Sequence, residues 1–315
     1  MQRFSIEGVD VTRAILGCDS LVSWLYEGDD SRFKGPDGNI DSSKAFEVMR
    51  ASAECGVRSI DLSPLLVDTF NILQDETDGG IEALGALQEW TCRNFVIDDV
   101  PLANYSEEIR ANMHSKLPPR YLENLKHSAT AGSSFAKSFL EPKSLAQPLT
   151  KSDIDRIRMK PDFFKERLEL YRKLNVKLVQ FGGGTADWLV ALGRIDLLRD
   201  LSQLIRNNGF VPLLICHWTS LVLPVAEKEL NVAGYIVPLN KLWGLLTLSE
   251  ALDTIKSVEK PMIAMKTLAQ GALAHDLQDA FTYLIEKLKV ASVLVGVSSA
   301  AEAKQTFSTL ARILG

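Results

Sequence analysis

The chain has 315 residues, of which 46% are hydrophobic and 24% are charged, a globular composition that can bury a substantial core. Thirty-five basic residues against forty acidic ones leave a net charge of −5. Nucleic acids and anionic membrane surfaces both require basic patches, so this balance argues against either as a partner. We expect a small-molecule ligand instead, and the sequence does not indicate an oligomeric state.

Signals for export or membrane insertion are not visible in the sequence. Residues 1–10 carry acidic groups and lack the apolar core of a secretory signal, and the most apolar stretch, 211–226, is short for a transmembrane helix. The four cysteines are scattered without CxxC pairs, which favours free, mostly buried thiols over disulfides or structural zinc. We therefore expect a cytoplasmic protein.

Short apolar runs alternate with amphipathic segments along the whole chain. Eight runs predict strands, at 13–19, 57–62, 94–99, 176–181, 211–217, 233–239, 261–266 and 291–296. Helical periodicity marks the segments 45–53, 81–92, 151–173, 186–208, 248–258, 277–288 and 300–314. This alternation predicts an α/β protein with parallel strands covered by helices.

Eight repeats are the number that closes a (β/α)8 or TIM barrel, which we predict as one domain over 1–315. The competing architecture is an open, doubly wound sheet. Such a sheet prefers a GxGxxG turn after its first strand, and residues 17–20 do not start that spacing. The barrel is therefore the favoured fold.

One connection is much longer than the others and follows the third predicted strand. The excess lies in 101–160, which holds Pro118-Pro119 and the small-residue run 129–134. In a barrel, an insertion after a strand falls on the carboxyl face, where active sites lie. We expect a lid or a pocket wall there, with a passive surface ornament as the alternative.

Polar side chains stand at the carboxyl ends of the predicted strands. In a barrel these ends meet at one face and carry the chemistry, although polar residues are also expected there without a function. Candidate substrate-binding residues are Asp19, Asp98, Gln180 and Asn240, and candidate catalytic residues are Asp61, His217 and Lys266. We expect no metal, because the acidic residues and His217 show no metal-ligand spacing.

Lys266 and His217 carry the most distinctive chemistry. A lysine at the end of an apolar strand could have a lowered pKa and form a Schiff base, could bind an anion, or could simply pair with Asp61 or Asp19. An imidazole at a barrel mouth can transfer protons, bind a metal or donate to a polarised oxygen. A histidine packed on Trp218 and bonded to backbone would do none of these, so the alternatives stay open.

The loop after the last predicted strand is a candidate anion site. Loops after the last two strands often form the phosphate site of a barrel. Ser298 and Ser299 precede the helix 300–314, and backbone N–H groups at a helix N-terminus bind anions. The alternative is that these serines only cap the helix.

Three stretches resemble the aldo-keto reductase superfamily. Residues 261–271 (PMIAMKTLAQG) and 291–303 (ASVLVGVSSAAEA) resemble the seventh and eighth strands of that family. Residues 54–61 (ECGVRSID) are similar to its second strand, where Asp61 matches the catalytic aspartate. The resemblance implies NADP or NAD as a cofactor, with its pyrophosphate held by Gly296, Ser298 and Ser299.

Three other catalytic positions of the family differ in this chain. The tyrosine expected five positions after the aspartate is Leu66, and the lysine expected at the end of the third strand is replaced by Asp98-Asp99. The histidine expected at the end of the fourth strand is replaced by Phe181-Gly182. Without the tyrosine and the lysine, no tuned phenol protonates a carbonyl as hydride arrives. The chain therefore resembles a divergent member that lacks the family's Tyr, Lys and His.

Three functions follow as hypotheses. The first is a divergent oxidoreductase on a small carbonyl or hydroxy compound. The second is an aldolase or lyase that uses Lys266 as an imine-forming amine, with Asp61 and His217 as proton-transfer partners. The third is a non-catalytic barrel that binds a small molecule.

Overall fold

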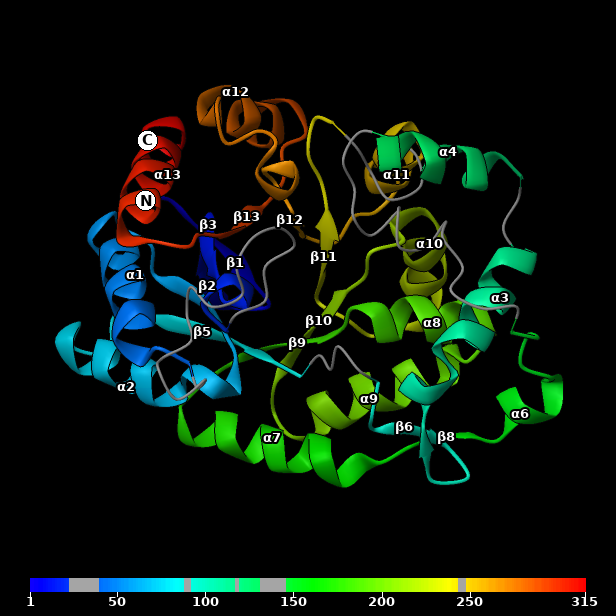
Figure 1. Ribbon diagram of the computed structural model, residues 1–315. Helices are drawn as coiled ribbons and strands as arrows, with labels where there is room; N and C mark the ends of the chain where they lie inside the picture. Colours follow the sequence, from blue (N-terminus) through cyan, green and yellow to red (C-terminus); the bar gives the residue numbers. More distant parts are fainter. Residues whose placement is uncertain (23–39, 88–91, 117–118, 131–145, 243–247) are drawn as a thin grey trace.

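The computed structural model describes residues 1–22, 40–87, 92–116, 119–130, 146–242 and 248–315. Eight parallel strands close into a barrel in the order β10-β11-β12-β13-β3-β4-β5-β9, with helices around it (Figure 1). The strands are β3 (Ala14–Gly17), β4 (Ser59–Leu62), β5 (Glu82–Ala86), β9 (Leu178–Gly182), β10 (Val211–Ile215), β11 (Gly234–Pro238), β12 (Met262–Met265) and β13 (Ser292–Gly296). The predicted (β/α)8 barrel is confirmed.

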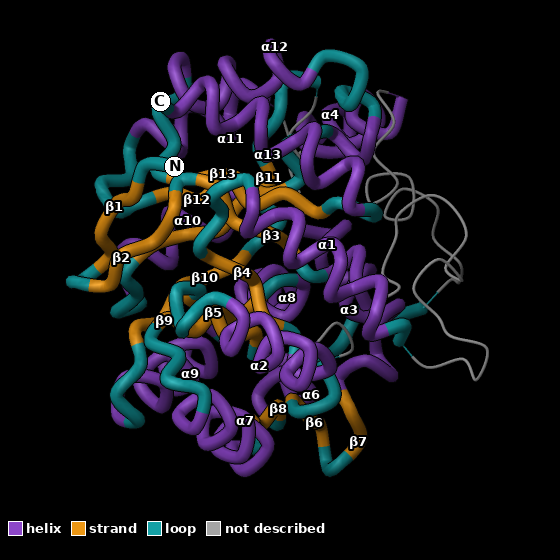
Figure 2. Tube along the Cα trace, turned by 90° about the vertical axis from the view of Figure 1, so that its left-hand side faces the viewer, coloured by secondary structure: helices purple, strands orange, loops and turns teal. Residues whose placement is uncertain are grey.

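Helices surround the strands in both views of the molecule (Figure 2). They are α1 (Ser42–Glu54), α2 (Val67–Glu76), α7 (Pro161–Lys173), α8 (Gly184–Leu192), α9 (Ile195–Asn207), α10 (Thr219–Glu229), α11 (Leu248–Lys256), α12 (Leu277–Thr282) and α13 (Ala300–Leu314). The segment predicted as one helix over 186–208 is two, because Gly193 adopts the left-handed conformation (φ 77°) that ends α8. No helix among the described residues is long and apolar enough to cross a bilayer.

Apolar side chains fill the inside of the barrel. Strands β3, β4 and β9 are buried along their whole length, as expected for parallel strands with both faces covered. The interior cluster contains Ile15, Leu84, Leu178, Leu213, Ile236 and Ile263, one from each of six strands. The barrel centre is therefore packed, and a ligand site is expected at an end of the barrel.

An antiparallel hairpin that the sequence did not indicate closes the amino end of the barrel. It consists of β1 (Arg3–Ile6) and β2 (Val9–Thr12), which lead directly into β3. Ile6 and Val11 are buried in the interior cluster. At the hairpin turn, both carboxylate oxygens of Glu7 accept hydrogen bonds from the Arg206 guanidinium, each 2.8 Å long. With this end closed, the carboxyl end is left for chemistry.

The third barrel strand is β5, and the helix predicted over 81–92 is wrong. Its alanines and leucines favour a helix locally, but their place in the barrel overrides that preference. Gly85 lies against the ring of Tyr171 from α7, where a Cβ atom would approach the ring to 2.7 Å. The Tyr171 hydroxyl donates to the carbonyl of Ala86 (2.7 Å), which fixes this strand against the helix.

The strand predicted at 94–99 exists, but it lies outside the barrel. It is β6 (Phe95–Ile97), which pairs antiparallel with β7 (Val100–Pro101) and β8 (Ile157–Met159) in a separate small sheet (Figure 1). Asp98 and Asp99 form its turn with φ values of 47° and 68°, and pair with Arg156 and Lys160. The predicted placement of Asp98 at the barrel mouth is therefore wrong. The prediction that Asp98 and Asp99 end the third barrel strand is wrong for the same reason.

The long insertion follows the third barrel strand, as predicted, but leaves the barrel earlier because that strand ends at Ala86. It contains α3 (Ser106–Lys116), α4 (Pro119–Thr130), α6 (Lys151–Asp155) and the small sheet. Helix α3 packs against α8 on the outside of the barrel. Of the predicted lid, 117–118 and 131–145 lie outside the described residues. Its role as a lid stays a prediction.

Candidate functional site

A cavity of about 360 Å³ opens at the carboxyl end of the barrel. Its wall comes from the ends of the strands, the loop after β12 and the first turns of α13. Among the residues proposed from the sequence, it brings together Asp19, Asp61, Gln180, His217, Lys266 and Gly296. Asp98, Asn240, Ser298 and Ser299 do not line it.

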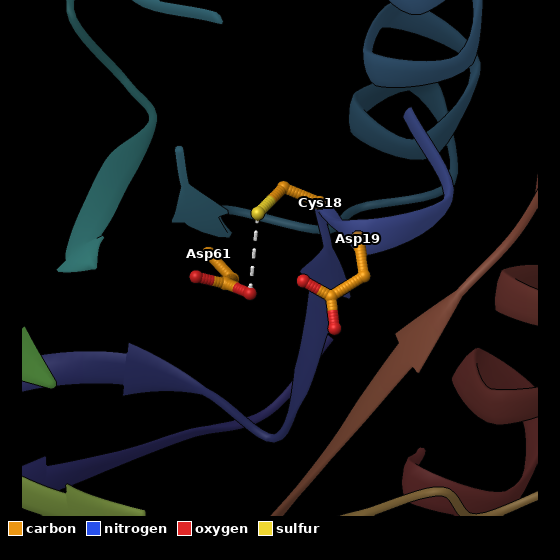
Figure 3. A group of neighbouring side chains, drawn as sticks. All are labelled: Cys18, Asp19 and Asp61. Carbon is orange, nitrogen blue, oxygen red and sulfur yellow. Dashed lines mark hydrogen bonds between the residues drawn. The ribbon is translucent and has the colours of Figure 1, made fainter. Parts of the chain in front are cut away.

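Asp61 is the buried carboxyl group at the centre of this cluster. It accepts hydrogen bonds from the Gln180 side-chain amide at Oδ1 and from the Cys18 thiol at Oδ2, the latter 3.4 Å long (Figure 3). Burial raises the pKa of Asp61 to about 7, and the negative charge of Asp19 raises it in the same direction. Near neutral pH this carboxyl group can therefore both hold and release a proton.

Cys18, Asp19 and Asp61 also form the group that could hold a metal ion. One ligand atom from each lies within 4.8 Å of the other two (Figure 3). Sulfur and carboxylate oxygen together are ligands that zinc accepts. Sequence spacing could not indicate this set, because the ligands come from the ends of two strands, β3 and β4, that are neighbours only in the barrel. Burial raises the pKa of Cys18 well above its usual value, which keeps the thiol protonated.

Lys266 directly follows β12 and lines the same cavity. Its backbone has a φ of 53°, a left-handed conformation that a lysine rarely adopts. Burial lowers the pKa of Lys266 to about 8, against the opposing charges of Asp19 and Asp187. Lys266 and Asp19 keep partial exposure because they face the cavity.

Asn240 holds the backbone of Lys266 in place. Its side-chain amide donates to the Lys266 carbonyl (3.2 Å), and its side-chain oxygen accepts from the N–H of Leu242 (2.9 Å). Asn240 is fully buried. The structure thus shows a positioning contact for Asn240, outside the cavity wall, where the sequence predicted substrate binding.

His217 is oriented by an aspartate that sequence reasoning missed. The ring Nδ1–H of His217 donates to Asp187 Oδ2 (2.9 Å), and the backbone N–H groups of His217 and Trp218 both donate to Asp187 Oδ1 (3.0 Å each). Asp187 and His217 are buried, and the imidazole lines the cavity. The histidine therefore has a carboxylate partner, the arrangement in which imidazole transfers protons.

The glycine run before α8 explains how Asp187 reaches His217. Gly182 has a φ of 102°, and a Cβ atom there would lie 2.6 Å from the carbonyl oxygen of Ile215. The N–H of Gly183 donates to that carbonyl (2.8 Å), so α8 begins directly beside β10. This close approach places the first turn of α8, with Asp187, under the end of β10. In the sequence, the glycine run 182–184 was the only signal of this close approach.

The serines before α13 are already paired within the chain. The Ser299 hydroxyl accepts from the N–H of Glu302 (3.2 Å), and Glu302 Oε2 accepts from the N–H (2.8 Å) and the hydroxyl (2.7 Å) of Ser298. This is a reciprocal helix cap. Lys304 points to Glu54 instead of the cavity, with its Nζ 3.4 Å from that carboxylate.

The cavity lining differs from the set that the family resemblance calls for. Leu66 is buried in a short 3-10 helix (Pro64–Leu66), and no tyrosine among the described residues lines the cavity. At the fourth barrel strand, Gln180 contacts Asp61. Within the described part of the chain, Lys266 is the one lysine or arginine in the wall. The amine therefore comes from the seventh barrel strand.

Comparison with known proteins bears on the fold. A Pseudomonas aeruginosa protein assigned to the aldo-keto reductases superposes with a TM-score of 0.56 at 13% identity, over 99% of this chain and 95% of that one. A Bombyx mori aldo-keto reductase in complex with NADP gives 0.51 at 10% identity, over 98% and 87%. At such identities the likeness concerns architecture: the chain has the barrel of the aldo-keto reductases. No protein-family model and no curated protein matches the sequence.

Proposed function

We propose that this chain, whose barrel is that of the aldo-keto reductases, is an enzyme that binds the carbonyl carbon of a small substrate to Lys266 as an imine. One observation carries the proposal. A lysine with a pKa of about 8 and a carboxyl group with a pKa of about 7, Asp61, line the same cavity at the barrel mouth. Active sites of such barrels lie at this end.

The lowered pKa supplies the nucleophile. Only the neutral amine attacks a carbonyl carbon, and with a pKa of about 8 roughly a tenth of Lys266 is neutral at pH 7. At the usual value of 10.5 the neutral fraction would be about 300-fold smaller. The gain comes from the packing around β12, which disfavours the ammonium form.

Asp61 supplies the proton that imine formation needs. The amine nitrogen forms a bond to the carbonyl carbon, the carbonyl oxygen takes up protons, and water leaves as the C=N bond forms. A carboxyl group with a pKa of about 7 is about half protonated at neutral pH, so it can donate the proton to the departing oxygen. Its hydrogen bonds from Gln180 and Cys18 fix the direction of the group.

His217 completes the chemistry of a lyase or aldolase. A protonated imine withdraws electrons from the neighbouring carbon, so a C–H or C–C bond there breaks when a base removes a proton from carbon or from a hydroxyl group. The imidazole of His217 lines the cavity and is held by Asp187, which suits it to that proton transfer. The reaction class is therefore reversible addition or cleavage beside a carbonyl group.

A nicotinamide-dependent oxidoreductase is the second candidate, favoured by the fold and by the NADP bound to the Bombyx mori protein. The donor set at α13 does not fit the dinucleotide phosphates. The N–H and hydroxyl of Ser298 bind the Glu302 carboxylate, and a phosphate there would meet that negative charge. We therefore derive no step through a nicotinamide cofactor.

Borohydride trapping tests the proposal. The chain is incubated with a panel of small ketones and aldehydes and sodium cyanoborohydride, and the modified peptide is identified by mass spectrometry. We expect a reduced adduct at Lys266, none at that site in Lys266→Met, and no change in the control Lys256→Met on the exposed end of α11. An unmodified Lys266 across the panel refutes the imine. A rise in nicotinamide fluorescence on binding NADH or NADPH would favour the oxidoreductase instead.

A further inference from the structure

The cavity extends beyond the cluster around Lys266 to the last helix of the chain. Asp61, His217 and Lys266 line it from the ends of the strands, and Glu302 and Gln305 line it from α13. Apolar side chains, among them Met265, Leu268, Leu294, Val295 and Val297, also line it. A molecule bound at Lys266 therefore shares the cavity with side chains of α13.

Two buried polar atoms in the wall have no hydrogen-bond partner among the described residues. They are Oε1 of Gln180 and Oγ1 of Thr267. Gln180 is fully buried and Thr267 is 2% exposed, and both line the cavity that contains Lys266. Gln180 donates its amide N–H to Asp61, so its oxygen is left as an acceptor. Buried polar groups are normally paired, and a hydroxyl group can serve either atom because it both donates and accepts.

Glu302 brings a negative charge to the cavity at the start of α13, where barrels often bind phosphate. The loops after the last two strands commonly supply that phosphate site. In this chain one carboxylate oxygen of Glu302 already takes the N–H and the hydroxyl of Ser298. Asp19, Asp61 and Glu302 line the cavity, against Lys266 and His217. A phosphate beside Glu302 would find the two Ser298 donors already occupied, and the Glu302 carboxylate would repel it.

We propose that the substrate is an unphosphorylated hydroxy-carbonyl compound. Its hydroxyl groups, next to the reacting carbon, meet Gln180 and Thr267, and its far end is uncharged or cationic beside Glu302. This inference rests on the proposed function for the reaction at Lys266. It adds the class of compound that the cavity accepts and makes Glu302 a specificity-determining residue.

A matched pair of probes tests the inference. Dihydroxyacetone and dihydroxyacetone phosphate differ only in the phosphate group, and cyanoborohydride traps each as an adduct on Lys266. We expect dihydroxyacetone to be trapped about tenfold faster, the effect of a nearby like charge. Glu302→Gln keeps an acceptor for Ser298 but removes the charge, so the ratio should fall to about threefold or less. The control Glu47→Gln, on the exposed face of α1, should leave the ratio unchanged.

Each outcome decides between the two proposals. Equal or faster trapping of the phosphate ester overturns the substrate class and leaves the imine intact. If neither compound modifies Lys266, the proposed function fails. The substrate class is then tested by measuring the binding of both compounds to Lys266→Met with ligand-observed NMR. Preference for the phosphate ester, or binding of neither compound, overturns the proposed substrate class. Removal of the acceptor by Thr267→Val should weaken dihydroxyacetone binding in the same assay.

Discussion

Burial is the main cause of the shifted pKa values of Lys266 and Asp61, and the charge of Asp19 adjusts both values. Asp19 raises the pKa of Lys266 by stabilising its ammonium form and raises that of Asp61 by like-charge repulsion. Asp19→Asn removes both effects, so both pKa values should fall. A charge at a few ångströms shifts a pKa by about 1–3 units, and because Asp19 keeps partial exposure we expect the lower end, about one unit.

The shift has a defined effect on the rate of imine formation. The reaction needs neutral Lys266, whose pKa is about 8, and protonated Asp61, whose pKa is about 7, so the rate should peak at about pH 7.5. In Asp19→Asn the peak should move to about pH 6.5. At pH 7 the neutral fraction of Lys266 would rise from roughly a tenth to roughly a half.

The assay measures the rate at which Lys266 forms a conjugated enaminone with a 1,3-diketone. The ultraviolet absorbance of the enaminone is recorded over time at pH values from about 5 to about 10. The control is Asp10→Asn, an exposed carboxylate on β2 at the opposite end of the barrel. Its profile should match that of the unaltered protein. A profile of Asp19→Asn that stays in place or moves to higher pH would refute the electrostatic account of Lys266.

Further substitutions at three positions test the packing around the site. Lys266→Met should raise the unfolding free energy at pH 7 by roughly 3 kcal/mol, because burial has lowered the lysine pKa from 10.5 to about 8. That advantage should shrink between about pH 8 and pH 10.5, where the unaltered protein gains stability as pH rises, and urea unfolding at several pH values measures it. Asp187→Ala should lower the free energy of unfolding by roughly 3 kcal/mol, because the backbone and ring N–H groups of His217 lose their acceptor. Asp187→Asn should lower stability less, as measured by thermal unfolding, but should still slow enaminone formation. Gly182→Ala should fail to accumulate as folded protein, judged by circular dichroism, since its Cβ atom would lie 2.6 Å from the Ile215 carbonyl oxygen.

The barrel could be predicted because its signal is repeated. Apolar runs that return eight times with helical segments between them define the architecture even when one strand is misassigned. The misassigned strand was β5, whose small residues fit a helix as well as a strand. The pairing of β5 with β4 and β9, and the contact of Gly85 with Tyr171, decide between them. Local propensity could not contain that information.

The site was predictable where strands ended on polar residues and unpredictable where a helix supplied the partner. Asp61, His217 and Lys266 were proposed from their position at strand ends, and all three line the cavity. Asp187 was missed because it lies in the first turn of α8, and its contact with His217 depends on the close approach at Gly182. A glycine run before a predicted helix indicates that the backbone comes close to a neighbouring element. It does not indicate which side chain of the helix will make the contact.

The proposed imine chemistry depends on burial of Asp61 and Lys266 in one cavity. The two groups stand on the second and seventh barrel strands, far apart in sequence, and closure of the barrel brings both to one cavity. The same poorly solvated surroundings disfavour the charged form of each group, which raises the pKa of the acid and lowers that of the amine. Both values therefore move towards neutrality from opposite sides. That is the condition under which a proton donor and a neutral nucleophile exist together, and it requires burial of the pair, not a particular strand for the lysine.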